Sequence, residues 1–189
     1  MAEQPGGPSN YNIANGLTAL RIVLVPVFSW MQLSHPLEPW WRFWTALVFL
    51  LAILTDTADG YLARRFNIIT RFGKLADPIA DKALTGMAFI GFSYNHELWW
   101  WVTIAILVRE WGITVLRFFV LRYGVMAAGR GGKAKTVVQA VAVILYLLPL
   151  PSWAHPVAAF VMLVAFVLTM LTGLDYIRDA VRLRRQSRR

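Results

Sequence analysis

The chain alternates between long apolar stretches and short polar connections. Each apolar stretch has about 20 residues, the length that an α-helix needs to cross the hydrocarbon core of a bilayer. We therefore predict an all-α integral membrane protein with six transmembrane helices. The predicted helices are residues 15–33, 40–64, 73–94, 98–122, 134–150 and 155–177. The pattern shows no internal repeat and no second domain.

The remaining segments are polar. Residues 1–11 are rich in Gly and Pro and predict a flexible N-terminal segment, because they can bury little apolar surface. Residues 12–178 form the predicted six-helix transmembrane domain. Residues 179–189 form a basic C-terminal tail, which we expect to contact anionic lipid headgroups.

Lysine and arginine are concentrated on one side of the predicted bundle. They occur in the connection between the second and third helices, in the connection between the fourth and fifth, and in the tail, whereas the opposite connections hold only Arg42. The positive-inside rule therefore predicts that both termini lie in the cytoplasm and that the protein resides in the cell membrane. The net charge of +9 then reflects cytoplasmic loops and not nucleic-acid binding.

Composition agrees with the membrane assignment. Apolar residues make up 58% of the chain, nine residues are Trp, and the mean hydropathy is +0.52. The chain has no cysteine, which excludes disulfides, thiolate zinc sites and thiol nucleophiles.

Four aspartates occur where a membrane helix should be apolar. Asp56 and Asp59 lie near the end of the second predicted helix, and Asp77 and Asp81 lie in the first turns of the third. Spacings of three and four residues place each pair on one helix face. Because the second helix descends to the cytoplasm and the third leaves it, we expect both pairs at similar depth.

Four neighbouring carboxylates need compensating charge in a membrane. Each costs about 2.5–3.5 kcal/mol at the centre of a bilayer and less near its surface. Two divalent cations would balance four negative charges, and ligands that are all carboxylates favour hard ions such as Mg²⁺ or Mn²⁺. Two such ions can clamp a phosphoryl group during its displacement. The alternative is an Asp–Arg network that only holds the helices together.

Small and cationic residues surround the aspartates. Gly60, Ala63 and Gly73 leave room for a ligand close to the backbone, and Arg64 is placed to meet a phosphate. The complete pattern is Asp56-x-x-Asp59-Gly60-x-x-Ala63-Arg64, eight residues, then Gly73-x-x-x-Asp77-x-x-x-Asp81. At all of these positions it resembles the signature of the CDP-alcohol phosphotransferase family.

This resemblance implies a fold and a chemistry. Members of the family are six-helix membrane enzymes, commonly homodimers, whose active site opens to the cytoplasm. It implies that the four aspartates hold two divalent ions, Mg²⁺ or Mn²⁺, and that Asp81 is the general base on the acceptor hydroxyl. It further implies that Gly60, Ala63, Arg64 and Gly73 bind the CDP group of CDP-diacylglycerol and that CMP is the leaving group.

The histidines are unsuitable as an alternative base. His35, His96 and His155 all fall in connections on the external side of the predicted topology, opposite the aspartates. An aspartate therefore remains the candidate. A bound metal can compensate for its weak basicity by acidifying the attacking hydroxyl.

A second set of charged residues bears on the acceptor. Charges within a membrane helix are functional candidates, and Arg and Lys recognise phosphate well. We expect this set to bind the phosphate of an anionic acceptor, although Arg109 could instead pair with Glu110, and the lysines could simply reflect the positive-inside bias. The candidates are Arg109, Arg117, Lys133, Lys135 and Thr136.

Several segments also resemble the branch of the family that uses glycerol 3-phosphate. They are Val108-Arg109-Glu110, the stretch 132–136, and Asn15-x-x-Thr18-x-x-Arg21. The implied acceptor is glycerol 3-phosphate and the implied product phosphatidylglycerophosphate. Phosphatidylglycerol and inositol 1-phosphate are the alternative acceptors. Arg21 could meet the pyrophosphate or extend to the membrane surface.

Two hypotheses come from other functional classes. A metal-ion or proton-coupled transporter could use the aspartates as a pathway, but such proteins place the site near the midplane and usually have repeated halves. A membrane scaffold could carry the aspartates as inert residues. The complete motif argues against both.

Overall fold

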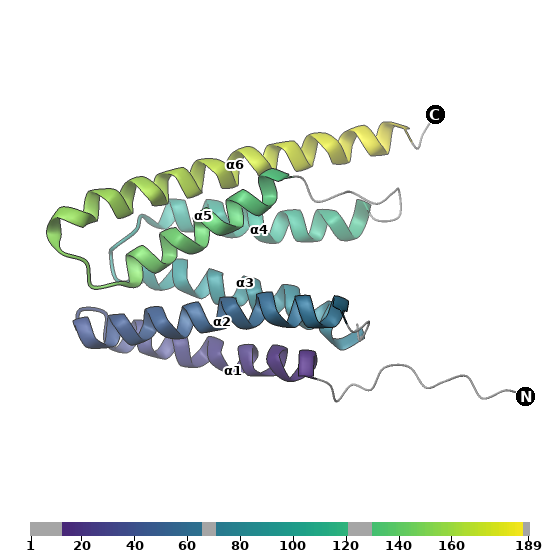
Figure 1. Cartoon of the computed structure of the whole chain (residues 1–189). Helices are drawn as coiled ribbons and strands as arrows, with labels where there is room; N and C mark the ends of the chain where they lie inside the picture. The colour runs from purple at the N-terminus through teal and green to yellow at the C-terminus, as the bar shows by residue number, and fades with distance from the viewer. Residues whose placement is uncertain (1–12, 66–70, 121–129, 187–189) are drawn as a thin grey trace, which may run out of the picture. The chain divides into compact units, whose positions relative to one another are not determined.

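The computed structural model describes residues 13–65, 71–120 and 130–186, and over these residues the chain is helical (Figure 1). The helices belong to two compact units, Met1–Gly91 and Phe92–Arg189, which divide near the end of α3. The predicted all-α class is confirmed. The predicted N-terminal segment lies outside the described residues.

The amino-terminal unit contains α1 (Ile13–Ser34), α2 (Pro39–Arg65) and most of α3 (Arg71–Tyr94). A short connection joins α1 to α2, and these two helices lie antiparallel and side by side (Figure 1). The rings of Phe28 and Phe49 pack between them with centroids 5.5 Å apart. These apolar contacts fix the register of the two helices that carry Arg21 and Asp56.

A buried polar contact connects α1 to α3. Nε2 of Gln32 donates a hydrogen bond to the carbonyl oxygen of Ala88 over 3.0 Å. Gly91, one turn further along α3, leaves room for the Gln32 carboxamide, which a Cβ at that position would overlap. In a membrane helix such a bond matters because a buried carboxamide needs partners within the protein.

The carboxyl-terminal unit contains α4 (Trp100–Val120), α5 (Arg130–Leu147), the short 3₁₀ helix η2 (Ser152–Ala154) and α6 (His155–Gln186). Helix α6 packs against both α4 and α5. Small buried residues, including Ala142, Ala158 and Ala165, allow these helices to approach closely. This packing brings polar residues of all three helices together.

The connection from α3 to α4 is a tight helix stop. The N–H of Glu97 donates to the carbonyl of Phe92 over 2.8 Å, and the N–H of His96 donates to that of Ser93 over 3.2 Å. These two bonds form a Schellman motif, which requires a left-handed residue. His96 fills that position with φ of 59°, where glycine is usual.

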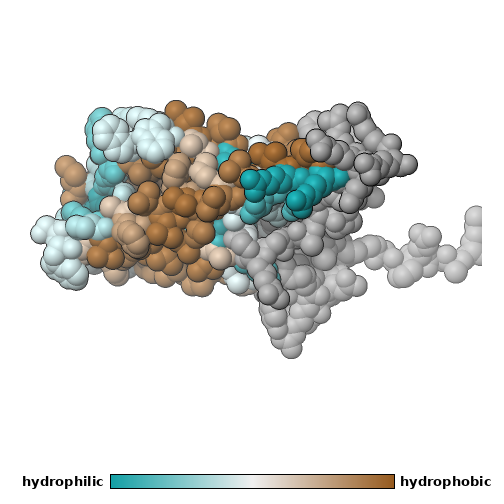
Figure 2. Space-filling model, turned by 90° about the horizontal axis from the view of Figure 1, so that it is seen from above, coloured by the Kyte–Doolittle hydropathy of each residue, from teal (hydrophilic) through white to brown (hydrophobic). Residues whose placement is uncertain are grey.

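Three helices have the length and composition to cross a membrane within the described residues. The qualifying spans are Gly16–Ser34, Pro39–Ala58 and Ser152–Arg182. Large apolar side chains are exposed on these helices, for example Val23, Leu54 and Phe160. Figure 2 shows apolar side chains over the middle of the face that it views. Such a surface is suited to lipid and not to water.

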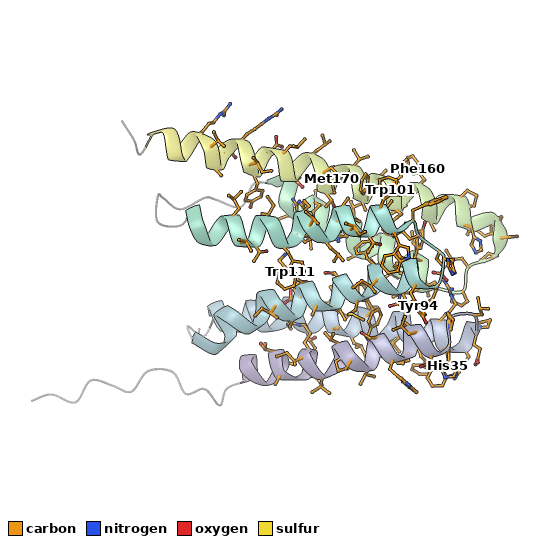
Figure 3. All side chains as sticks on the ribbon, turned by 180° about the vertical axis from the view of Figure 1, so that it is seen from behind. His35, Tyr94, Trp101, Trp111, Phe160 and Met170 are labelled. Carbon is orange, nitrogen blue, oxygen red and sulfur yellow. The ribbon has the colours of Figure 1, made fainter. Side chains whose placement is uncertain are left out.

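Exposed tryptophans gather at the connections. Trp40 lies in the first turn of α2, Trp99 precedes α4, Trp100 and Trp101 open it, and Trp153 lies in η2. Figure 3 shows Trp101 and Phe160 near the first turns of α4 and α6, which begin at the same end of the carboxyl-terminal unit. Tryptophan at helix ends is typical of the membrane–water interface.

The helix boundaries correct several predictions. The bounds of α1, α2 and α3 lie within two residues of those predicted, whereas α5 begins at Arg130 and not at Ala134. The largest error concerns α6, which continues to Gln186 and does not end at Ile177. Part of the predicted basic tail is therefore helical. The segment has no Gly or Pro to stop the helix, and Asp175 and Arg178 form an i,i+3 ion pair of 3.7 Å.

Candidate active site

An ion pair joins α1 to α2 in the amino-terminal unit. Nη1 of Arg21 lies 2.6 Å from Oδ1 of Asp56, the first aspartate of the motif. The Arg21 side chain is fully buried, whereas that of Asp56 is 41% exposed. A guanidinium removed from water requires a counter-charge, and Asp56 supplies one. The alternative in which Arg21 extends to the membrane surface is therefore wrong.

The neighbouring turn of α1 supports this arrangement. Thr18 and Arg21, three residues apart, are both buried and share one face of α1. The same helix face therefore carries the cation to Asp56 and a hydroxyl one turn before it. The contact of Arg21 with a pyrophosphate stays a prediction.

Asp81 lies on α3 beside a small cavity of the same unit. The Asp81 side chain is partly exposed, and its backbone carbonyl accepts a hydrogen bond of 2.9 Å from the Thr85 hydroxyl. A cavity of about 280 Å³ lies between α1 and α3. Its lining residues are Ile22, Val25, Ile79, Ala80 and Ala83. Neither Arg21 nor Asp81 is among them.

The helical spacing behind the metal prediction is confirmed. Helix α2 continues through Arg65 and α3 begins at Arg71, so both aspartate pairs lie on continuous helix. Several predicted site residues belong to these helix ends, but their side chains lie outside the described part of the structure. They are Asp59, Gly60, Ala63, Arg64, Gly73 and Asp77.

The described donors fit a hard divalent metal in kind. Asp56 and Asp81 are oxygen ligands, they are partly exposed, and they are supplied by α2 and α3. Among the side chains that the structure describes, no three His, Cys, Asp or Glu residues form a cluster. The side chains of Asp59 and Asp77, which the motif pairs with Asp56 and Asp81, are not among those described.

A compact ionic network occupies the carboxyl-terminal unit. Oε1 of Glu110 accepts a hydrogen bond of 2.7 Å from Nη1 of Arg109 and another of 2.6 Å from Nζ of Lys135. Nη2 of Arg109 donates to the hydroxyl of Thr172 over 2.7 Å. The network therefore joins α4, α5 and α6. Figure 3 labels Trp111, the residue after Glu110, midway along α4.

The network is largely withdrawn from the surface. The side chains of Arg109 and Glu110 are each 12% exposed, and that of Lys135 is 8% exposed. Two cations share one carboxylate, so these three groups carry a net charge of +1. Charged groups this far from water are costly unless partners compensate them, as the Glu110 carboxylate does here for both cations.

The predicted acceptor residues separate into two groups. Arg109 and Lys135 meet at Glu110, which the sequence indicated only as an alternative partner of Arg109. Lys133 and Thr136 are exposed, and the Thr136 hydroxyl donates to the carbonyl of Gly132 over 3.1 Å. The Arg117 side chain lies outside the described part of the structure.

Comparison with known proteins identifies the family. The model of the CDP-alcohol phosphatidyltransferase family matches residues 11–171, which include the whole aspartate motif. The chain belongs to the CDP-alcohol phosphatidyltransferase family. It is therefore an enzyme of that family, which argues against the transporter and the inert scaffold.

Relatives in three bacteria resemble this CDP-alcohol phosphatidyltransferase along most of its length. A protein of Mycobacterium tuberculosis named probable phosphatidylglycerophosphate synthase is 48% identical, and the match covers 90% of this chain and 82% of the relative. Two proteins are named CDP-diacylglycerol–glycerol-3-phosphate 3-phosphatidyltransferase. The Bacillus subtilis protein is 35% identical over 88% of this chain and 93% of its own, and the Escherichia coli protein 36% identical over 90% and 95%.

The histidines of this phosphatidyltransferase lie at helix connections. His35 follows α1, hydrogen bonds to Glu38 and stacks on Trp41 with ring centroids 4.3 Å apart. Figure 3 shows it where α1 and α2 are connected. Asp56 lies on α2 about 25 Å from that end, at 1.5 Å per residue. His35 therefore cannot serve as base to a reaction at Asp56.

Sequence reasoning missed one residue of the network and one that makes room for it. Thr172 accepts the bond from Arg109, and a Cβ at Gly173 would come within 3.0 Å of the Arg109 side chain. The signal was a hydroxyl and a glycine side by side within the apolar sequence of α6. Small polar residues in a membrane helix commonly mark a helix–helix contact.

Proposed function

We propose that this enzyme transfers the phosphatidyl group of CDP-diacylglycerol to glycerol 3-phosphate, giving phosphatidylglycerophosphate and CMP. The observation that carries the proposal is the match, over about nine-tenths of the chain, to relatives whose names state this reaction. The complete aspartate motif supports the chemistry, and the buried cations of α4 and α5 support an anionic acceptor.

The aspartates would hold the divalent metals of this reaction. Asp56, Asp59, Asp77 and Asp81 provide carboxylate oxygens of the kind that Mg²⁺ and Mn²⁺ prefer. When bound, these ions would offset the charge on the pyrophosphate of the donor and favour ionisation of the acceptor hydroxyl. Arg21 contributes by fixing the orientation of Asp56, because its guanidinium is buried and lies 2.6 Å from that carboxylate.

In this reaction the other motif residues would act on the acceptor hydroxyl and on the CDP group. Asp81 accepts the proton of the glycerol 3-phosphate hydroxyl, whose oxygen bonds to the phosphorus that carries diacylglycerol. The bond from that phosphorus to the oxygen of CMP breaks, and CMP leaves with the electron pair. Arg64 and the small residues Gly60, Ala63 and Gly73 bind the CDP group close to the helix backbone.

The cationic residues would select the acceptor. Glycerol 3-phosphate carries a phosphate that Arg and Lys side chains recognise through charge-assisted hydrogen bonds. The candidates are those predicted from the sequence: Arg109, Arg117, Lys133, Lys135 and Thr136. Phosphatidylglycerol, the alternative acceptor for a cardiolipin synthase, would need a second groove for acyl chains. Inositol 1-phosphate, the other alternative, would use the same cations.

We also propose six membrane spans with both termini in the cytoplasm of a bacterial cell, and assembly as a homodimer. The exposed apolar surfaces of α1, α2 and α6 support membrane insertion. The cationic connections support an active site that faces the cytoplasm. Membership of a family that is commonly dimeric supports the homodimer.

An acceptor screen tests the proposed function. Purified enzyme in detergent receives CDP-diacylglycerol and Mg²⁺, with glycerol 3-phosphate, inositol 1-phosphate or phosphatidylglycerol offered separately, and CMP release is measured. We expect turnover with glycerol 3-phosphate alone, and loss of turnover with a metal chelator that added Mg²⁺ or Mn²⁺ reverses. Turnover with only one of the other acceptors would refute the substrate, and full turnover with chelator would refute the metals.

A further inference from the structure

The contacts around Glu110 hold the side chains of Arg109 and Lys135 in place, which binding of a phosphate does not by itself require. Its two cations are held differently. Arg109 donates to Glu110 and to Thr172, and its buried Nε has no hydrogen-bond partner among the described residues. That side of Arg109 packs on Gly173, where even a methyl group would come within 3.1 Å of Nε. Arg109 is therefore enclosed by α6.

Lys135 is held by its hydrogen bond to Glu110. Its ammonium donates to Glu110 over 2.6 Å, from a helix other than the one that carries Glu110. A lysine side chain has four rotatable bonds and a charge without directional preference, so it adopts a fixed position only when a partner imposes one. Glu110 imposes that position, because the same carboxylate oxygen is also bonded to Arg109.

We propose that Glu110 is a positioning residue that holds the Lys135 ammonium for the phosphate of the acceptor. Arg109 anchors the Glu110 carboxylate, because its guanidinium bonds to Glu110 and to Thr172 of α6. The order of contacts is Thr172 and Gly173 of α6, then Arg109, then Glu110, then Lys135. The inference rests on the proposed function, since it assumes a phosphorylated acceptor.

The charges of the three groups also support a positioning role for Glu110. Without Glu110 the two buried cations would repel each other, and Lys135 would move toward water. With Glu110 in place the group keeps one net positive charge, which attracts a phosphate, and the carboxylate keeps the ammonium at a fixed point. Preorganisation of this kind lowers the cost of ordering a side chain when a ligand binds.

Steady-state kinetics with both substrates test the proposal. We expect Glu110→Gln to raise KM for glycerol 3-phosphate about tenfold, the scale of one hydrogen bond between charged groups, and to leave KM for CDP-diacylglycerol within about twofold. Lys135→Ala should raise the same KM, and the double variant should be no worse than Lys135→Ala alone. Glu38→Gln, an exposed carboxylate on the connection to α2, is the matched control and should behave as wild type.

A second variant, Glu110→Asp, tests the proposal if Glu110→Gln does not fold. Glu110→Asp keeps the charge balance but withdraws the carboxylate by one methylene, and it should raise KM for glycerol 3-phosphate by severalfold. The proposal is overturned if Glu110→Gln and Glu110→Asp keep the wild-type KM for glycerol 3-phosphate. It is also overturned if the effects of Glu110→Gln and Lys135→Ala multiply in the double variant. Absence of turnover by the wild type with glycerol 3-phosphate would instead refute the proposed function.

Discussion

Gly173 offers a quantitative test of the contact between α6 and Arg109. A Cβ at this position would lie 3.0 Å from Cγ and 3.1 Å from Nε of Arg109. Normal contact needs about 0.3–0.4 Å more, so Arg109 must shift while its bonds of 2.7 Å to Glu110 and Thr172 lengthen. Gly173→Ala gains about 1 kcal/mol of helix propensity, and this crowding should cancel most of that gain.

Gly112 supplies the matched control. It also lies inside a helix, α4, but a Cβ there would meet nothing within 4 Å. Gly112→Ala should therefore keep the full propensity gain of about 1 kcal/mol, which raises Tm by roughly 2–4 °C. Gly173→Ala should leave Tm nearly unchanged, and Gly173→Val should lower stability by about 1–3 kcal/mol.

Thermal unfolding of the purified variants in one detergent measures these differences. In an Arg109→Ala background the crowding disappears, and Gly173→Ala should then stabilise as much as Gly112→Ala does. If Gly173→Ala stabilises the wild-type background by the same amount as Gly112→Ala, Arg109 is not held against α6. The order of contacts in the network would then be refuted.

Three further predictions address the turn, the base and the topology. His96→Gly should raise the free energy of unfolding by about 1 kcal/mol, because glycine adopts φ of 59° without strain; a lower Tm in thermal unfolding would contradict this. Asp81→Asn should abolish CMP release while CDP-diacylglycerol still binds, and normal turnover by this variant would remove Asp81 as the base. Because the chain lacks cysteine, Ser152→Cys and Ser187→Cys can report topology by thiol labelling of intact cells. The first should react with an impermeant reagent and the second should not, and the reverse result would overturn the orientation.

The fold could be predicted where apolar runs end at clear breaks. Pro36 and Pro39 separate α1 from α2, and the predicted bounds there are accurate. The same reasoning placed the helix ends wrongly where a helix extends beyond the apolar residues that lipid can surround. Hydropathy indicates which residues lipid can surround, whereas α5 and α6 begin or continue in charged sequence that forms helix equally well.

The candidate site could be predicted in part for a similar reason. The aspartate motif lies within two consecutive helices, so helical spacing was enough to place each pair on one face. Partners on distant helices were not accessible to that reasoning. Thr172 is 63 residues from Arg109, and the pairing of Lys135 with Glu110 spans 25 residues, so only the packing of α4, α5 and α6 reveals them.

Identification of the lipid product tests the central claim most directly. The purified enzyme, CDP-diacylglycerol, Mg²⁺ and labelled glycerol 3-phosphate would be incubated together, and the organic phase analysed by mass spectrometry with CMP measured in the aqueous phase. The account predicts labelled phosphatidylglycerophosphate and CMP in equal amounts, and neither product with Asp81→Asn. CMP release without labelled lipid would show hydrolysis of the donor and would contradict the proposed transfer.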